Sequence, residues 1–342
     1  MNKLRVLFLA HPELIPPDDL DSVSESLRFE FKTEYDVITT LRASGHEVKP
    51  LGVQYELSPI RDEVENWKPD IVFNMLEEFH SNTLYAQNVA SLLELLKVPY
   101  TGCNPRGQML ARGKDLSKKL LKYHRIPTPS FAVFPIGRKV KRPRGLGFPL
   151  IVKSLSEDAS LGISQASVVE DDEALEKRCI FIHEKIGTAA IAEEYIEGRE
   201  IYVGVLGNDR RYVLPVWELE FSKLAASSLP IATAMVKHNP DYQEKRGVLQ
   251  GRAKDLPPSL ENRIRKMVIR ICETLELDGY ARIDFRLAPD GTPYFIEANP
   301  NPDIASSQEF AQAALFDGVS YADLLDRLLT LGIRRAGQEV EA

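Results

Sequence analysis

The sequence predicts an α/β protein in which a parallel sheet comes first and a mostly antiparallel region follows. Up to about residue 108, short apolar runs alternate with helical patterns, and this alternation is typical of a parallel sheet with helices on both faces. From about residue 189 onward, the expected strands follow one another in the meander style of an antiparallel sheet. A chain of 342 residues is too long for one small core, so we expect two or three domains.

Composition narrows the class of protein. The chain carries 43 Lys and Arg against 50 Asp and Glu, a net charge of −7, so we expect neither a nucleic-acid nor a membrane partner. Its 3 cysteines lie far apart without a CxxC pair, which predicts neither a disulfide framework nor a zinc site. The N-terminal apolar run Val6–Ala10 is too short for a signal peptide. We therefore expect a cytoplasmic protein.

The N-terminal region is expected to alternate strands and helices. The expected strands span 4–9, 47–51 and 70–74, and the expected helices span 33–43 and 83–97. The loop after the first strand contains three prolines and no GxGxxG, so the fingerprint of a dinucleotide-binding protein is absent.

The central part of the chain is expected to hold a helix at 114–124, strands at 149–155 and 165–169, and a helix at 172–185. The run Arg138–Arg144 packs five basic residues into seven; we expect a solvated loop, with an anion-facing role as the alternative. The stretch Gly107–Asp115 looks like a P-loop. It has five residues between its glycines and an Asp where a Ser or Thr would bind Mg²⁺, so we reject that interpretation.

Two short segments are candidates for binding a nucleotide. Lys153 lies within an expected strand, and the turn Ser156–Ser164 after it offers hydroxyls and backbone N–H groups that could surround a phosphate. The alternative is a lysine at a sheet edge whose ammonium reaches water. Near residues 191–200, a strand edge with Glu193, Glu194 and Glu200 could bind an adenine amino group and ribose hydroxyls; each acid alone is more often a surface charge.

The last part of the chain is expected to hold strands at 189–196, 200–206 and 211–217, an aperiodic lid loop at 221–257, a helix capped by Ser259, and a final helix at 321–331 followed by a frayed tail at 334–342. Between the two helices lies the hairpin Tyr280–Asp303. Polar and apolar residues alternate along its first strand, and Asp290-Gly291 is expected to form a two-residue turn.

The expected register of this hairpin places Asp284 opposite Glu297 and Arg282 opposite Asn299 on one face. Two directly opposed carboxylates repel each other unless something lies between them. A divalent cation would relieve that repulsion, because Mg²⁺ binds a few carboxylate oxygens together with substrate phosphates. The alternative is a solvated face whose arginines neutralise the acids, and the pairing alone leaves both interpretations open.

Several motifs in a fixed order decide between these interpretations. They are VPYTG, GKDLSKKLL, PLIVKSLSEDASLGIS, EEYIEGREIYVGVLG, GYARIDF and FIEANPNP. Together, from about residue 71 to the final helix, they resemble the ATP-grasp superfamily, and most closely its D-alanine–D-alanine ligase branch. The resemblance favours the metal interpretation of the hairpin.

The resemblance implies a fold of three parts. These are an N-terminal Rossmann-like pre-ATP-grasp domain (1–108), a central small α+β ATP-grasp subdomain (109–191), and a C-terminal, mostly antiparallel subdomain (192–342) with the metal site and lid. ATP would lie between the last two.

The resemblance also implies roles for particular residues. Lys114, Lys153 and Ser160 would contact the phosphates of ATP, Glu193, Glu194 and Ile196 the adenine, and Glu200 the ribose. Asp284, Glu297 and Asn299 would bind Mg²⁺ or Mn²⁺, Arg282 would stabilise the tetrahedral intermediate, and Lys237 would close over the γ-phosphate.

The implied activity is that of an ATP-dependent carboxylate–amine ligase. ATP would phosphorylate a carboxylate, and an amine would displace the phosphate to give an amide, ADP and phosphate. We expect small-molecule carboxylate and amine substrates, and a homodimer is one possible assembly.

Departures from the branch indicate a substrate other than two D-alanines. Ala159 stands where the ligases have a Ser, His238 where they have a Tyr, and Asp303 lies in a segment that has lost a Gly. We expect Asp303 and His238 to face the substrate, Asp303 opposite a cationic or amino group. The glutamate that the family uses near the N-terminus is Glu25, Glu30 or Glu34, and the sequence does not decide among them. The alternatives to an amino-acid or peptide ligase of other specificity are a true D-alanine–D-alanine ligase and an ATP-binding regulatory module without activity.

Overall fold

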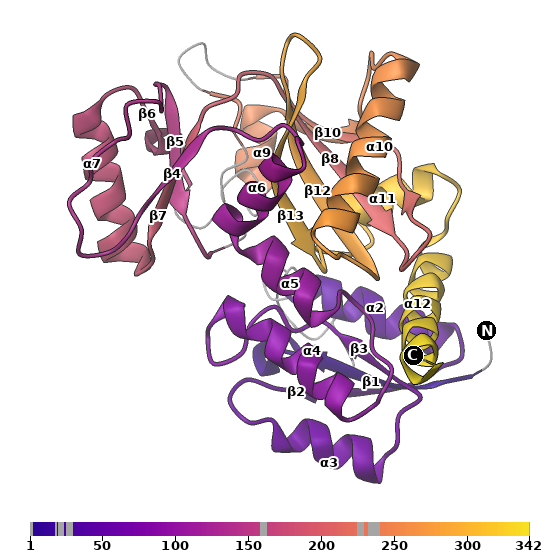
Figure 1. Cartoon of the computed structure of the whole chain (residues 1–342). Coiled ribbons are helices and arrows are strands. Elements are labelled where there is room, and N and C mark those ends of the chain that lie inside the picture. The colour runs from indigo at the N-terminus through magenta and orange to yellow at the C-terminus, as the bar shows by residue number, and fades with distance from the viewer. Residues whose placement is uncertain are drawn as a thin grey trace.

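The computed structural model describes residues 3–17, 19, 24, 30–157, 163–223, 229–231 and 240–341. These parts of the chain form a three-stranded, a four-stranded and a six-stranded sheet. In Figure 1 the three-stranded sheet lies at the bottom, the four-stranded sheet at the upper left and the six-stranded sheet at the upper right. The expected architecture, a parallel N-terminal sheet followed by a small α+β part and a mostly antiparallel part, is confirmed.

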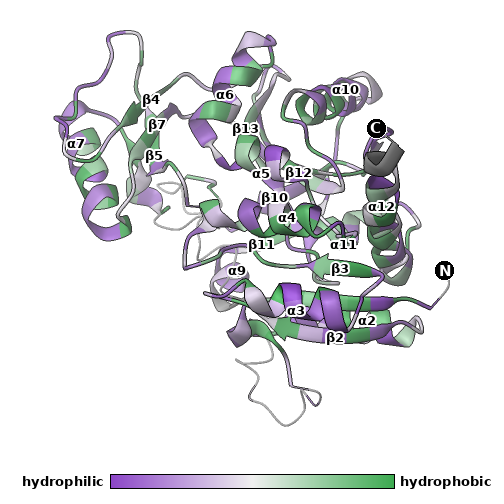
Figure 2. Cartoon of the chain, turned by 60° about the horizontal axis from the view of Figure 1, so that its bottom comes forward, coloured by the Kyte–Doolittle hydropathy of each residue, from purple (hydrophilic) through white to green (hydrophobic). Residues whose placement is uncertain are grey.

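The first sheet is parallel and is buried on both faces. Its strands are β1 (Arg5–Ala10), β2 (Glu47–Gly52) and β3 (Ile71–Asn74), in the order β2-β1-β3. It is covered by α2 (Lys32–Ala43), α3 (Ser58–Asn66) and α4 (Ala86–Leu95), and short 3-10 turns lie at Pro12–Leu14 and Thr83–Tyr85. Val6 and Phe8 pack against α2, whereas Leu7 and Leu9 pack against α3 and α4. Successive strand residues point to opposite faces, so a sheet with helices on both faces needs strands whose residues are apolar on both sides. Strand β3 has the hydrophobic colour in Figure 2.

The central sheet is antiparallel. Its strands are β4 (Phe131–Phe134), β5 (Leu150–Ser154), β6 (Val168–Val169) and β7 (Ala190–Glu194), in the order β4-β7-β5-β6. Helices α5 (Pro105–Arg112) and α6 (Lys114–Tyr123) precede it, and α7 (Asp172–Phe181), with a π-helical turn at Ile182–Ile186, packs on it. Because β7 pairs with β4 and β5, the expected meander of strands from residue 189 to 217 is wrong at its first strand.

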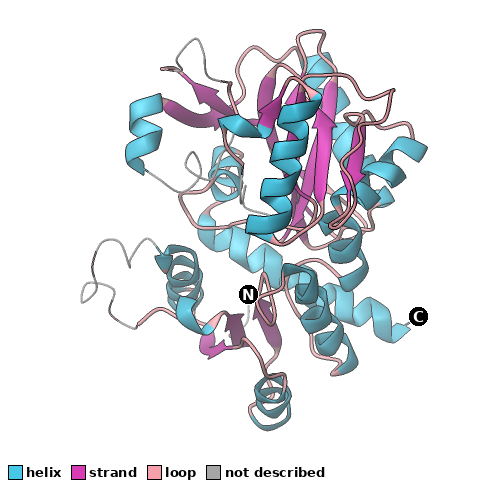
Figure 3. Cartoon of the chain, turned by 90° about the vertical axis from the view of Figure 1, so that its left-hand side faces the viewer, coloured by secondary structure: helices cyan, strands magenta, loops and turns pink. Residues whose placement is uncertain are grey.

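The large sheet carries helices on both faces, as Figure 3 shows. Its strands are β8 (Arg199–Leu206), β9 (Tyr212–Val213), β10 (Trp217–Phe221), β11 (Val248–Arg252), β12 (Tyr280–Leu287) and β13 (Pro293–Pro300), and the path β11-β10-β8-β12-β13 has β9 beside β8. The helices after β10 are α9 (Pro240–Arg246), α10 (Pro258–Thr274), α11 (Glu309–Phe316) and α12 (Tyr321–Glu341). Ile283 of β12 packs with α10, whereas Tyr280 packs with Phe310 of α11 on the other face. Even-numbered residues of β12 therefore face away from α10.

The register of the β12–β13 hairpin is partly as expected. Asp284 lies opposite Glu297 and Arg282 opposite Asn299, which confirms the predicted pairing. The two-residue turn is wrong: the backbone N–H of Gly291 donates to the Ala288 carbonyl, so three residues form the loop. Proline fixes the φ that the second position of such a turn needs, and Gly291 takes the left-handed conformation at φ +79°. Asp284 pairs with Glu297 but Phe285 pairs with Phe295, so β13 bulges at Ile296. This bulge restores the expected register on the side of the hairpin away from the turn.

Other local expectations need correction. Helix α10 begins with Pro258 in its first turn and has no side-chain cap, so Ser259 is not its cap. The region 221–257, expected to be an aperiodic loop, contains α9 and β11 among its described residues. The expected strand 165–169 forms only Val168–Val169, after a 3-10 turn at Gln165–Ser167.

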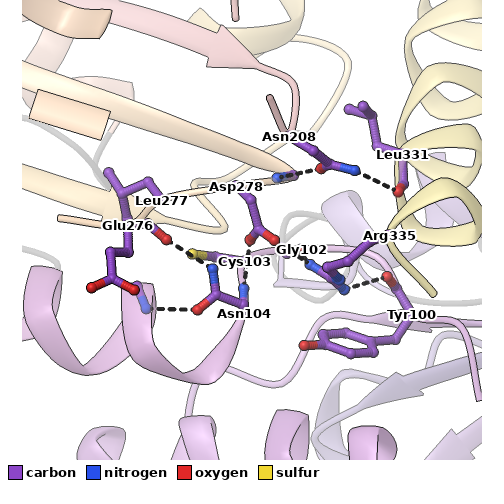
Figure 4. A network of polar contacts seen from close by, with 12 residues as sticks. Tyr100, Gly102, Cys103, Asn104, Asn208, Glu276, Leu277, Asp278, Leu331 and Arg335 are labelled. Atoms are coloured by element: carbon purple, nitrogen blue, oxygen red, sulfur yellow. Dashed lines mark hydrogen bonds and ion pairs between the residues drawn. The ribbon is translucent and has the colours of Figure 1, made fainter. Parts of the chain in front are cut away.

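Helix α12 extends ten residues beyond the end predicted from the sequence, through the segment expected to be a frayed tail. Arg335 is only 7% exposed and lies at the junction of the first and last domains. It donates to the carbonyls of Tyr100 (2.8 Å) and Gly102 (2.7 Å) and pairs with Asp278 at 3.2 Å, as Figure 4 shows. The backbone N–H of Asn104 donates to the same Asp278 at 2.7 Å. This network ties the C-terminal helix to the link between the N-terminal and central parts.

Candidate active site

A cleft of about 690 Å³, which includes space open to solvent, lies where the central and large sheets meet. Seven of the predicted site residues line it: Lys153, Glu193, Glu194, Ile196, Glu200, Asp284 and Glu297. They come from β5, β7, the β7–β8 connection, β8, β12 and β13, so strands of both sheets contribute. The segments predicted to bind the nucleotide and the metal are thus brought to one cavity.

A buried ionic cluster forms one wall of the cleft. Glu193 of β7 is 1% exposed and pairs with Lys118 at 3.0 Å and with Lys153 at 3.1 Å. Burial alone would raise the pKa of Glu193, but the two ammonium groups outweigh it and hold that pKa below its usual value. Two lysines against one glutamate leave an excess positive charge beside the cavity, which suits an anionic group such as phosphate.

Lys118 was missed by sequence reasoning. It lies on α6, and its Nζ also donates to the carbonyl of Ile296 on β13. Burial lowers the pKa of Lys118 to about 8, although the nearby Glu193 opposes that shift. The signal was present, because Lys114, Lys118 and Leu121 recur at helical spacing and are all buried on one face.

Lys114 lies outside the residues that line the cleft. It begins α6, is buried, and its Nζ donates to the carbonyl of Glu157 at 2.6 Å. Glu157 belongs to the Ser156–Ser164 turn, so Lys114 contacts the beginning of the segment predicted to surround a phosphate. Ala159 and Ser160 of that turn, and Lys237 and His238 of the predicted lid, lie outside the described residues.

The β7–β8 connection carries the predicted adenine and ribose contacts. Glu200 lies directly opposite Arg286 of β12, and their side chains form an ion pair at 3.3 Å. Arg286 also donates to the carbonyls of Ile196 (3.1 Å) and Pro230 (2.8 Å). It therefore braces the ribose-binding candidate and holds residues 229–231, one of the described segments of the predicted lid, against the cleft. The alternation of residues along β12 predicts that Arg286 lies on this face. That Arg286 pairs with Glu200 could not be predicted from the sequence, because it depends on β8 and β12 being neighbours in the sheet.

The hairpin supplies the predicted metal ligands. Asn299 donates its Nδ2 to Asp284 Oδ2 at 3.1 Å, and Glu297 lies beside them at the paired position. No group of three or more His, Cys, Asp or Glu side chains within the described ranges is arranged to hold a metal by itself. Two carboxylates and an amide nevertheless fit Mg²⁺, because that ion is bound through one or two carboxylates together with substrate phosphates. Glu297 also raises the pKa of Lys153, against the opposing effect of burial, which places the two walls close together.

Arg282 is held by acids on two elements. Its guanidinium makes a two-point contact with Asp284, at 2.8 and 2.9 Å, and a third contact with Glu309 of α11 at 3.2 Å. Burial alone would lower its pKa, but Asp284 and Glu309 raise that pKa further above its usual value, so the group is always charged. These contacts use three of its five N–H groups, which leaves two for an oxygen of a substrate.

A family model described as the D-Ala–D-Ala ligase C-terminus matches residues 120–330. The chain belongs to the D-alanine–D-alanine ligase family. The match includes β5, β7, β8, β12 and β13, which are the strands that line the cleft. Within the described parts of this ligase-family member, no helix is long and apolar enough to span a membrane.

Individual relatives agree with this assignment. The family member is 31% identical over 269 residues to the protein y4sG of Sinorhizobium fredii, covering 78% of this chain and 75% of that protein. It is 29% identical over 310 residues to the D-alanine–D-alanine ligase of Aquifex aeolicus, covering 90% and 97%. The crystal structure of the Bacillus anthracis D-alanine–D-alanine ligase complexed with ATP superposes with a TM-score of 0.74 over 98% and 99% of the two chains, at 23% identity. The fold is therefore the ATP-grasp fold.

Proposed function

We propose that the chain is an ATP-dependent carboxylate–amine ligase that forms an amide or peptide bond through an acyl phosphate and releases ADP and phosphate. One observation carries the proposal. Lys153 and Glu193, which pair with each other beside the buried Lys118, line the same cleft as the opposed Asp284 and Glu297 of the other sheet. Excess positive charge on one wall and paired carboxylates on the other suit a nucleotide triphosphate and its magnesium ion.

Each residue of the cleft has a part in this chemistry. Asp284, Glu297 and Asn299 would hold Mg²⁺, which when bound neutralises charge on the phosphates. Lys153 and Lys118 attract the anionic end of the nucleotide, and Glu200, braced by Arg286, accepts hydrogen bonds from ribose hydroxyls. The charges on both walls are fixed before the substrates arrive, so little reorganisation is needed during the reaction.

Arg282 is placed to stabilise the oxyanion that forms when an amine adds to the acyl phosphate. Asp284 and Glu309 fix its guanidinium in one orientation, so no ordering of the side chain is required. A preorganised donor of this kind is worth about 3 to 4 kcal/mol of barrier.

The substrate is proposed to be an amino acid or small peptide other than a pair of D-alanines, because Asp303 places a carboxylate near this arginine. The D-alanine–D-alanine ligase activity remains the second candidate. The extended similarity to the Aquifex aeolicus enzyme favours it. An inactive ATP-binding module is less well supported, since Arg282, Asp284, Glu297, Asn299 and Lys153 are all in place.

A screen of amino acids and dipeptides for Mg²⁺-dependent phosphate release from ATP tests these alternatives. The proposal expects release with a substrate other than D-alanine, and an amide product by mass spectrometry. Strong stimulation by D-alanine alone would replace the first candidate by the second. Release of pyrophosphate and AMP would contradict the acyl-phosphate route, and ATP binding without turnover of any carboxylate would favour the regulatory alternative.

A further inference from the structure

The first turn of α2 meets the segment that follows β13. The Thr33 hydroxyl donates to Asp303 Oδ1 at 3.0 Å. Three residues further along α2, Asp36 accepts hydrogen bonds from the backbone N–H and the hydroxyl of Ser306, at 3.0 and 2.7 Å. These contacts connect the N-terminal domain to the end of the strand that carries Glu297.

Glu34, next to Thr33, is buried there, and none of the described residues forms an ion pair with it. It is 5% exposed, and no other described residue donates a hydrogen bond to its carboxylate or pairs with it. Burial, with smaller contributions from Glu77 and Asp303, raises the pKa of Glu34 to about 8. A buried carboxylate without a partner is costly, and natural proteins keep such groups mostly where a ligand or ion completes the site.

A second polar group at the same place has no partner. The hydroxyl of Tyr321, at the start of α12, is buried and forms no hydrogen bond. The charges of Asp36, Asp303 and Glu34 all act on this hydroxyl, in addition to its burial, and raise the pKa of Tyr321. A hydroxyl without a hydrogen bond and a buried carboxyl group without a described counter-charge therefore both lie around Asp303.

The cations nearby are already engaged. Arg282 is held by Asp284 and Glu309, and Lys32 pairs with Asp36 at 3.3 Å. Among the described residues, Asp303 accepts from two neutral groups, the Thr33 hydroxyl and the backbone N–H of Ala305. Asp303 is exposed, so a ligand can reach it. Within the described ranges, neither Glu34 nor Asp303 forms an ion pair.

We propose that Glu34 and Asp303 form a subsite for positively charged groups of the amino-acid substrate, so that the enzyme acts on a basic amino acid. Glu34 holds a proton in the free protein, and a cation bound beside it would lower its pKa and release that proton to solvent, so that two carboxylates then match two positive charges. The α-ammonium of any amino acid supplies one of them, and an amino or guanidino group on the side chain supplies the other. The neighbouring Arg282 places this subsite beside the proposed reaction centre. This inference rests on the proposed ligase function.

Matched pairs of substrates test the subsite. Ornithine and norleucine have side chains of equal length, with an ammonium in one and a methyl group in the other, as do 2,4-diaminobutyrate and norvaline. Phosphate release from ATP is measured with each amino acid, in both enantiomers, with and without alanine as the amine. We expect kcat/KM to favour the basic member by about tenfold or more, the usual effect of one charge-assisted hydrogen bond.

Three variants assign any preference to the subsite. Asp303→Asn keeps an acceptor for Thr33 and removes the charge, and Glu34→Gln does the same at the buried position. The variant that loses the partner of the side-chain cation should reduce the preference for ornithine over norleucine about tenfold, and the variant that loses the partner of the α-ammonium should slow both substrates alike. Glu65→Gln, which alters an exposed carboxylate on α3 in the N-terminal domain, is the control and should change neither rate.

The outcomes separate the subsite from the proposed function. Phosphate release with norleucine equal to that with ornithine would overturn the subsite and leave the ligase function standing. If no amino acid releases phosphate, calorimetric titration with ornithine alone decides the matter. Ornithine binding that Asp303→Asn abolishes would support the subsite while the ligase proposal fails, and the absence of ornithine binding would overturn the subsite as well.

Discussion

Replacing Glu34 by glutamine should stabilise the protein at alkaline pH and change its stability much less at pH 5. Burial raises the pKa of this carboxyl from 4.5 to about 8. The folded protein therefore keeps the proton over a pH range in which the unfolded chain has already lost it. For such a group, the free energy of unfolding falls as the pH rises through that range and is fully reduced above about pH 8.

The size of this effect follows from the two pKa values. Each pKa unit corresponds to about 1.4 kcal/mol, so a rise from 4.5 to about 8 corresponds to about 5 kcal/mol. Glutamine has the shape of the protonated acid and does not titrate in this range. The advantage of the variant over the natural protein should therefore grow from about 1 kcal/mol at pH 5 to about 5 kcal/mol at pH 9.

Urea unfolding at pH 5, 7 and 9, followed by circular dichroism, measures this difference. All other titrating groups are shared by the two proteins, so their contributions cancel in the comparison. Glu30→Gln changes an exposed carboxylate and should show no pH-dependent difference from the natural protein. A Glu34→Gln advantage that stays constant from pH 5 to 9 would refute the reasoning, because it would mean that the carboxylate is neither desolvated nor unpaired.

Three further substitutions test the site and the domain junction. Glu297→Gln should lower phosphate release at least a hundredfold with an unchanged unfolding transition, and a fully active variant would contradict the metal assignment. Lys118→Met removes one cation from a buried pair and should cost about 3 kcal/mol of stability in urea unfolding and weaken ATP binding, whereas Lys119→Met, at an exposed position, should do neither. Arg335→Met should cost about 2 to 3 kcal/mol by thermal unfolding because its buried carbonyl partners lose their donor, and the exposed Arg334→Met is its control.

The hairpin shows how far local sequence reasoning reaches. Alternation fixed the face on which Arg282 and Asp284 lie, and the opposition to Glu297 and Asn299 is as predicted. The turn was misjudged because Asp290-Gly291 suits both a two-residue loop and a three-residue loop that begins with proline. The error did not reach the metal ligands, since a bulge at Ile296 compensates for the extra turn residue.

Other residues of the site depend on contacts between distant segments. In the sequence, Lys118 looks like an ordinary surface charge on a short basic helix. Its role depends on the ion pair with Glu193 of β7, which the sequence alone does not show. The isolation of Glu34 requires knowing that α2 packs beside the segment after β13, which no local pattern reveals. The extension of α12 was missed for a similar reason, because its Arg-rich end suggests a solvated tail unless the buried carbonyl partners of Arg335 are known.

Helix α12 has a consequence for the order in which the chain becomes structured during synthesis. Leu324, Leu325 and Leu328 belong to the same core cluster as Val6 and Phe8 of the first strand. The ribosome releases the N-terminal domain first, yet one face of its sheet lacks this cover until the last helix has emerged. The N-terminal domain is therefore completed only when α12 is in place, and a chain interrupted before α12 would leave apolar surface of β3 and α2 open to water.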